Sequence, residues 1–165
     1  MNYEADNCRQ HLLHAAAKFV DTVKNFSGVA QIAVVGSILT VKRDPKDIDL
    51  VVYIADNADL NKVAAAGRRL KGTAQTRNLG ADIFLANEKR QYIGRTCGWK
   101  LCEFGIRMAC RADHCGRRKY LNDDLSDLKL EAALVTNPPL VVWPTVVATI
   151  GIPNDVAEIL CRRQC

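Results

Sequence analysis

The sequence lacks several features that would assign its class at once. It contains no apolar run approaching the roughly 18–20 residues of a transmembrane helix, no low-complexity tract and no internal repeat. Its first residues are not a basic region followed by an apolar one, so we expect no signal peptide. Apolar residues make up 48% of the chain, too many for a mainly disordered protein. What remains is a globular chain of 165 residues with one core and no membrane partner.

Cysteine occurs seven times, an odd number, and without an export signal this favours a reducing cytoplasm over a disulfide framework. Four of the seven lie in one segment, at intervals that suit a tetrahedral Zn²⁺ site: Cys97, Cys102, Cys110 and Cys115. Zinc would order a segment that otherwise lacks a core. The alternative is a set of reduced thiols, because the spacing is not the two-residue pair of most zinc knuckles. His114 is the poorer ligand, since adjacent residues rarely both reach one metal.

The formal charge of +5 is distributed unevenly. Residues 86–119 hold nine basic and three acidic residues, whereas residues 120–165 hold three basic and six acidic ones. A basic segment of this size indicates an anionic partner such as phosphate, nucleic acid or an acidic protein face, and its plain alternative is a solvated surface loop.

Hydrophobic periodicity divides the chain into helices and strands. Helices are predicted over residues 7–25, over 56–71 with a stop at Gly72, in short turns within 121–134, and from Pro153 to about Arg163. Strands are predicted over residues 29–35, 47–54 and 81–86, with an extended segment at 140–143. This order predicts an α+β fold, a small mixed β-sheet flanked by helices. Residues 1–87 would form its core, and residues 88–165 an irregular cysteine-bearing extension that packs on the core.

Two carboxylates share one face of the second predicted strand. Side chains alternate along a strand, so Asp47 and Asp49 point the same way, about 7 Å apart, while Ile48 points into the core. Bare carboxylates so placed repel each other, and a bridging divalent cation removes that cost. Mg²⁺ prefers such oxygen ligands. Asp82, on the third predicted strand, would complete a two-metal site for phosphoryl transfer if the two strands pair.

A Gly-Ser pair ends the first predicted strand, and nine residues separate it from the first of these acids. Gly36 lets the backbone approach a phosphate closely, and the Ser37 hydroxyl and nearby N–H groups can bind its oxygens. A Gly-Ser pair alone and an Asp-x-Asp alone are both common, and the plain alternative for the two together is a turn at a strand entry with two solvated acids. The ordered set of apolar strand, Gly-Ser, Asp-x-Asp strand, helix and Asp-bearing strand favours catalysis.

With these residues, the chain resembles the DNA polymerase beta-like nucleotidyltransferase superfamily, and within it the minimal nucleotidyltransferase domains. The resemblance covers residues 7–87 and implies the nucleotidyltransferase fold. It implies that Gly36 and Ser37 contact a nucleoside triphosphate, that Asp47 and Asp49 hold two Mg²⁺ ions, and that Asp82 holds one ion and helps to activate the acceptor. Members transfer a nucleoside monophosphate to a hydroxyl and release pyrophosphate.

The acceptor stays open at this point, because it is usually defined by what is appended to the core. A protein hydroxyl, as in antitoxins that modify a partner toxin, an RNA or a small molecule all fit. The basic segment favours RNA. A competing hypothesis is a zinc-stabilised basic module that binds nucleic acid or a partner without catalysis.

Five further positions have both a structural and a functional interpretation. Trp99, among basic residues, suits base stacking or packing, and packing is the more usual role. Trp143 and Tyr53 are expected in the core. His11 and His14, three residues apart, are expected to be ordinary helix residues rather than a metal pair.

Overall fold

The structure, a computed structural model, describes residues 3–102, 118–123 and 130–162, with side chains from residue 8 onward. In this part of the chain, strands form one mixed sheet in the order β5-β4-β3-β2-β1-β6-β7. The strands are β1 (Val29–Val35), β2 (Asp47–Ile54), β3 (Gly80–Asn87), β4 (Tyr92–Thr96), β5 (Leu121–Asn122), β6 (Leu140–Trp143) and β7 (Val147–Ala148). The helices are α1 (Tyr3–Val23), α2 (Leu60–Gln75), α3 (Ala132–Thr136), α4 (Asn154–Val156), a 3-10 turn η1 (Ser37–Leu39) and a π-helical turn η2 (Ala157–Cys161).

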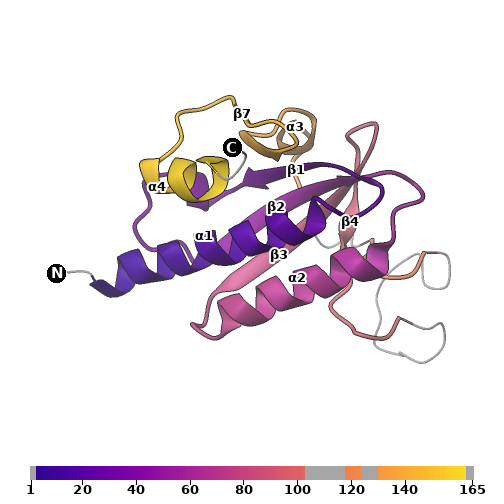
Figure 1. Cartoon of the computed structure of the whole chain (residues 1–165), viewed down its shortest axis with the longest axis horizontal. Coiled ribbons are helices and arrows are strands. Elements are labelled where there is room, and N and C mark those ends of the chain that lie inside the picture. Colours follow the sequence, from indigo (N-terminus) through magenta and orange to yellow (C-terminus); the bar gives the residue numbers. More distant parts are fainter. Residues whose placement is uncertain (1–2, 103–117, 124–129, 163–165) are drawn as a thin grey trace.

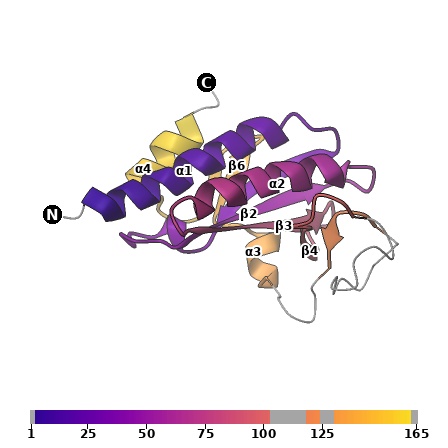
Figure 2. The same cartoon turned by 90° about the horizontal axis from the view of Figure 1, so that it is seen from below.

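The helices cover the sheet unequally. The long helices α1 and α2 lie side by side on one face (Figure 1), and α3 lies on the other (Figure 2). Alternation along β2 explains both cores: Ile48, Leu50 and Val52 are fully buried under α1 and α2. Val51 and Tyr53 point to the α3 face, where they pack with Val135. Each such apolar side chain contributes about 1.5–3 kcal/mol on burial.

A cluster around Tyr53 fastens α3 to its face of the sheet. The Tyr53 hydroxyl donates a 2.6 Å hydrogen bond to the Val135 carbonyl oxygen. The Arg90 guanidinium lies 5.5 Å from the Tyr53 ring centroid and donates to the Thr136 carbonyl oxygen and to Gln31 Oε1. Burial raises the pKa of Tyr53 to about 12, with Arg90 acting in the opposite direction, so the phenol stays a donor at neutral pH.

Strand direction brings three strand ends together. β1 and β2 are antiparallel, whereas β2 and β3 are parallel and joined by α2 as the crossover. The end of β1 and the beginnings of β2 and β3 therefore lie at one end of the sheet, which is where the candidate site residues fall.

The α+β class and the first strands agree with the sequence predictions. β1 and β2 have the predicted bounds, β3 is one residue longer at each end, and β6 coincides with the predicted extended segment. The prediction for α2 was wrong at both ends. Asp59 caps the helix by accepting from the Asn61 N–H, so it begins at Leu60. Gly72 lies inside the helix, because one glycine costs only about 1 kcal/mol there.

The larger error concerns the extension, which supplies four strands to the sheet. β4 was missed because it is short and contains Gly94, at φ 135°. A Cβ at Gly94 would lie 2.4 Å from the Asn122 carbonyl oxygen, so only glycine lets β5 pair this closely. Residues 121–122, predicted as helical, form that strand, and the predicted turn appears only at α3.

The C-terminal helical segment also differs from its prediction. It begins at Asn154 after Pro153, and no side chain caps it. It continues as the π-helical turn η2 to Cys161. Within the described ranges, no helix combines the length and hydropathy that crossing a membrane requires.

Candidate functional site

The structure brings the three predicted carboxylates to one end of the sheet. In the register, Asp49 pairs with Val35 of β1 on one side and with Asp82 of β3 on the other. Asp47 lies two residues earlier on β2, opposite Gly80. All three side chains therefore belong to the face opposite α1 and α2. Pairing of β2 with β3, the condition set by the sequence analysis, is met.

Two glycines provide the space that two of these carboxylates occupy. Gly36 has φ 84°, and a Cβ there would lie 2.7 Å from Asp49 Oδ2. A Cβ at Gly80 would lie 2.1 Å from Asp47 Oδ1. A side chain at Gly36 would be strained by the positive φ and would meet Asp49, whereas a side chain at Gly80 would displace the exposed Asp47 carboxylate. The predicted Gly36-Ser37 turn thus lies directly against Asp49, with Ser37 opening η1.

Asp49 has the most unfavourable electrostatic position of the three. Burial raises its pKa to about 6, and the negative charges of Asp82 and Asp47 push in the same direction. At neutral pH, a half-buried carboxylate beside two others concentrates negative charge at this end of the sheet. Such a position attracts a cation and is typical of functional sites.

Arg95 on β4 takes part in the site, although the sequence analysis counted it only in the basic segment. Its Nη1 lies 3.2 Å from Asp82 Oδ1. The pair is partly exposed, so it stabilises the fold only slightly, but it orients the Asp82 carboxylate. Arg95 was missed because its placement depends on β4, the strand that the sequence did not reveal.

The three carboxylates match the ligand type of a divalent cation, although they do not yet form one cluster. Three carboxylates on adjacent strands provide the hard oxygen ligands that Mg²⁺ prefers, and the glycine positions leave room for them. Among described residues, however, no three His, Cys, Asp or Glu side chains already stand as one metal-ligating cluster. With Asp82 engaged by Arg95, the carboxylates are neighbours whose side chains must converge to share an ion.

A second missed residue, Arg9 of α1, holds the segment that follows Gly36-Ser37. Its side chain is almost completely buried and donates to the carbonyl oxygens of Ile38, at 2.8 Å, and Lys42, at 3.2 Å. Its Nε and Nη2 contact the two carboxylate oxygens of Asp155 at 2.5 and 3.1 Å. Arg9 therefore ties α1, the turn at the site and α4 together. The sequence contained a sign of this role, because Arg9 lies four residues before Leu13 and so on the same helix face as this buried residue.

The predicted zinc ligands are only partly described. Cys97 is buried and its N–H donates to the Tyr120 carbonyl oxygen at 2.8 Å, while Cys102 is half-buried. Cys110, Cys115 and His114 lie outside the described residues, so zinc remains a prediction.

The other flagged residues fall in different environments. Trp143 packs against the main core and Tyr53 is buried, as predicted. His14 is exposed, and His11 Nε2 lies 2.8 Å from the Thr73 carbonyl oxygen, as expected for ordinary helix residues. Trp99 is 47% exposed, so its packing role and its base-stacking role both stay predictions.

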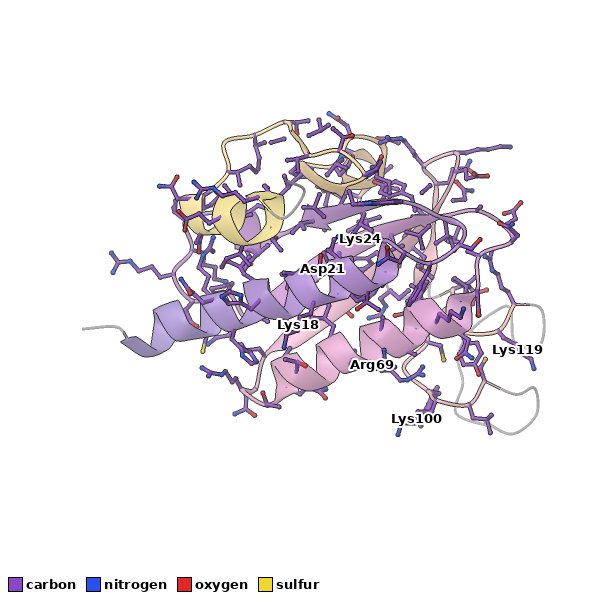
Figure 3. All side chains as sticks on the ribbon, in the orientation of Figure 1. Lys18, Asp21, Lys24, Arg69, Lys100 and Lys119 are labelled. Carbon is purple, nitrogen blue, oxygen red and sulfur yellow. The ribbon has the colours of Figure 1, made fainter. Side chains whose placement is uncertain are left out.

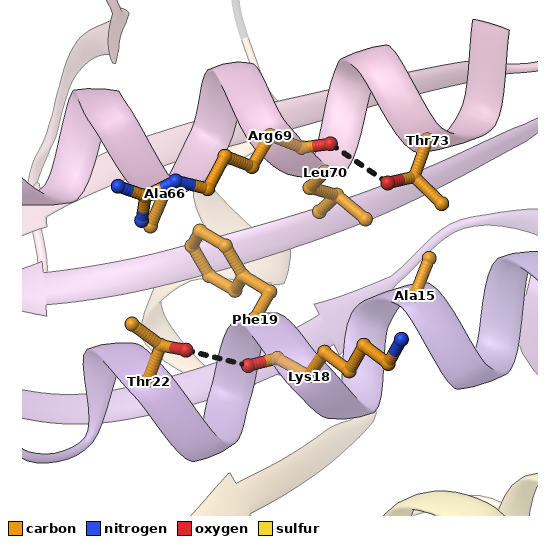
Figure 4. A pocket seen from close by; sticks show the side chains of 8 residues that line it. All are labelled: Ala15, Lys18, Phe19, Thr22, Ala66, Arg69, Leu70 and Thr73. Atoms are coloured by element: carbon orange, nitrogen blue, oxygen red, sulfur yellow. Dashed lines mark hydrogen bonds between the residues drawn. The ribbon is translucent and has the colours of Figure 1, made fainter. Parts of the chain in front are cut away.

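The molecule has a hollow between α1 and α2, on the helix-covered side of the sheet, whereas the carboxylates belong to the opposite face. It measures about 300 Å³, and Phe19 and Leu70 form its apolar floor (Figure 4). Lys18 and Arg69 are its charged lining residues. Among the described residues that line it, none is acidic.

Comparison with known proteins gave one match. A model described as a family of unknown function, DUF6932, matches residues 3–123, a range that includes all the site residues from Arg9 to Arg95. No curated protein matches the chain, and no solved structure does.

Proposed function

The chain belongs to the DUF6932 family, whose function is unknown, and we propose that it is a metal-dependent nucleotidyltransferase. The observation that carries the proposal is the position of Asp49. It lies in register with Asp82, against the Gly36 turn, with its pKa raised to about 6 by burial and by two neighbouring carboxylates. A site this acidic, directly against a glycine-containing backbone turn, suits a metal-bound triphosphate.

Each residue has a role that follows from its place. Asp47 and Asp49, and Asp82 from the next strand, would hold the magnesium. When bound, the ions supply positive charge that offsets the charge developing on the transferred phosphoryl group. The Ser37 hydroxyl and the backbone around Gly36 bind triphosphate oxygens. Arg9 keeps that turn in place through the Ile38 and Lys42 carbonyl oxygens.

The reaction moves a nucleoside monophosphate. The oxygen of the acceptor hydroxyl forms a bond to the α-phosphorus of the triphosphate. The bond from that phosphorus to the oxygen that bridges to the β-phosphorus breaks, and pyrophosphate leaves with the electron pair. The hydroxyl proton passes to the Asp82 carboxylate and from there to solvent.

Two readouts test the proposal on the purified full chain. The first is binding of fluorescent nucleoside triphosphates in the presence of Mg²⁺, which needs no acceptor. The second is release of pyrophosphate from labelled triphosphates with RNA, protein or small hydroxyl acceptors. We expect the Asp47→Asn/Asp49→Asn variant to lose transfer by about a hundredfold or more.

A matched control carries the same change of charge away from the site. The Asp56→Asn/Glu88→Gln variant changes two exposed residues that follow the opposite ends of β2 and β3, and it should bind nucleotide and release pyrophosphate as the wild type does. Equal binding and equal pyrophosphate release by wild type and the Asp47→Asn/Asp49→Asn variant would refute the enzyme and leave a non-catalytic binding module.

A further inference from the structure

A second hollow adjoins the candidate site on the side away from Asp49. It measures about 230 Å³ and lies between α2 and the end of the sheet where β4 leaves β3. Asp82, Arg95 and Thr96 line it from the strands, and Gly67, Arg68 and Lys71 line it from α2. Three cationic residues and one acidic residue thus line the pocket, here called the basic pocket, and this excess of positive charge favours an anion.

An exposed aromatic residue directly follows one of the residues that line the basic pocket. Gly98 lines the pocket, and Trp99 follows it with 47% of its surface exposed. Arg68 Nη1 donates a 3.0 Å hydrogen bond to the Trp99 carbonyl oxygen, which fixes the indole-bearing segment to α2. Lys100 is exposed beside it, and Figure 3 shows it past α2, on the side away from α1.

This combination is the one by which proteins hold single-stranded nucleic acids. Lys and Arg side chains contact phosphates, and an exposed aromatic ring stacks on a base of any sequence. An acidic protein surface would use the cations but would leave the indole without a partner of matching shape. The observations therefore favour a nucleic acid over an acidic protein.

The basic pocket shares one residue with the carboxylate site. Asp82 belongs to both, with Asp49 on one side in the register and the pocket on the other. An acceptor bound in the pocket would therefore lie beside Asp82, the residue to which the proposed function assigns the hydroxyl proton. The group that enters must carry a free hydroxyl close to a phosphate, as the 3′-terminal nucleotide of a strand does.

We propose that the basic pocket binds the 3′ end of a single-stranded nucleic acid as the acceptor, with Arg68 and Lys71 on its terminal phosphates and Trp99 stacked on a base. This inference rests on the proposed function. The 3′ oxygen then forms the bond to the α-phosphorus, pyrophosphate leaves, and the strand grows by one nucleotide. RNA and DNA share this chemistry, and the experiment includes both.

The first experiment measures binding alone, without nucleotide or divalent cation. The probes are fluorescein-labelled, unstructured oligoribonucleotides and oligodeoxyribonucleotides, followed by fluorescence anisotropy over a range of salt concentrations. For the Arg68→Gln/Lys71→Gln variant we expect a loss of affinity of about tenfold or more at low salt. The slope of log K against log salt should fall by about 1.4, since each neutralised phosphate of a single strand contributes about 0.7.

Two further variants separate the pocket from general charge. Lys18→Gln/Arg69→Gln removes the same two charges at the hollow between α1 and α2 and should bind like the wild type (Figure 4). Trp99→Ala should weaken binding by about fivefold or more without changing the salt slope, because stacking is not electrostatic.

The second experiment adds Mg²⁺ and nucleoside triphosphates and measures extension of the labelled strand. Binding through the pocket followed by extension of RNA or DNA supports the inference and identifies the strand. Binding through the pocket without triphosphate turnover on any acceptor supports the pocket as a nucleic-acid site and overturns the proposed function. Transfer to a protein or small molecule, with no effect of the Arg68→Gln/Lys71→Gln variant on strand binding, overturns the inference and leaves the proposed function standing.

Discussion

Replacing Asp49 by asparagine is expected to stabilise the metal-free protein by about 2–3 kcal/mol at about pH 7.5. The reason is the unfavourable charge of this carboxylate in the folded state. Burial, together with Asp82 and Asp47, raises its pKa from an ordinary 3.8 to about 6. Asparagine keeps the shape of the side chain and removes the charge, so the folded state no longer carries this penalty.

The pH dependence of the effect has a definite sign. Below the unfolded value of about 3.8, the Asp49 carboxyl is protonated in both states, and wild type and variant should differ little. As the pH rises through about 6, the wild-type folded state must take up the disfavoured charge and loses stability. The variant does not, so the difference should open between about pH 4 and pH 7.

Urea unfolding in the presence of a chelator measures the difference. Asp56→Asn, which removes an exposed carboxylate outside the site, is the matched control and should change the free energy of unfolding by no more than about 0.5 kcal/mol. If Asp49→Asn proved neutral or destabilising at every pH, Asp49 would not occupy the strained acidic position on which the proposed function rests.

Replacing Arg9 by methionine should lower the free energy of unfolding by about 3–5 kcal/mol. Methionine fills much of the space but leaves the Asp155 carboxylate without its partner. It also leaves the Ile38 and Lys42 carbonyl oxygens without their donor. Because those carbonyls belong to the segment after Gly36-Ser37, the variant should also weaken nucleotide binding beyond its effect on stability.

A double-mutant cycle with Asp155 separates the pair from simple packing. Burial alone would raise the pKa of Asp155, but the Arg9 contacts and the Val156 N–H lower it below its usual value. The stability from this pair is therefore present above the unfolded pKa and lost as the pH falls through the folded one. Adding Asp155→Asn to Arg9→Met should restore part of the loss at neutral pH, because no buried charge is then left alone.

The matched control is Arg162→Met. Arg162 pairs with Glu158 at 3.7 Å on the exposed surface, so its loss should cost no more than about 0.5 kcal/mol. A loss for Arg9→Met as small as the loss for Arg162→Met would show that Arg9 is not the anchor of the turn.

The sequence predicted the parts of the site that depend on local pattern. The alternation of β2 places Asp47 and Asp49 on one face without any knowledge of the fold. That Asp82 joins them required only that β3 pair with β2, which a crossover helix makes the natural arrangement. The strand bounds followed from apolar, β-branched runs, which have few other stable conformations in a protein of this size.

Contacts between residues far apart in the sequence could not be predicted from local sequence patterns. Arg9 and Asp155 are separated by 146 residues, and no periodicity links them. Arg95 lies on a strand whose glycine weakens the usual strand signal. The basic pocket draws Arg68 and Lys71 from α2 and Arg95 from β4, so counting charge along a segment of the sequence did not reveal it.

The same carboxylates should make the fold weaker without a cation and stronger with one. Mn²⁺ binds the same oxygen ligands as Mg²⁺ and gives a direct test. At about a hundred times its dissociation constant, a cation that binds only the folded state adds about 2.7 kcal/mol of stability. That gain is comparable to the penalty expected at Asp49.

The most direct measurement is therefore the free energy of unfolding of wild type and Asp49→Asn at about pH 7.5, with a chelator and with saturating Mn²⁺. We predict that the variant is the more stable protein in chelator. Mn²⁺ should stabilise the wild type by about 2–3 kcal/mol and the variant by less than about 1 kcal/mol, so that the advantage of the variant disappears. Equal gains in both proteins, or no gain in the wild type, would contradict a divalent-cation site built on Asp47, Asp49 and Asp82.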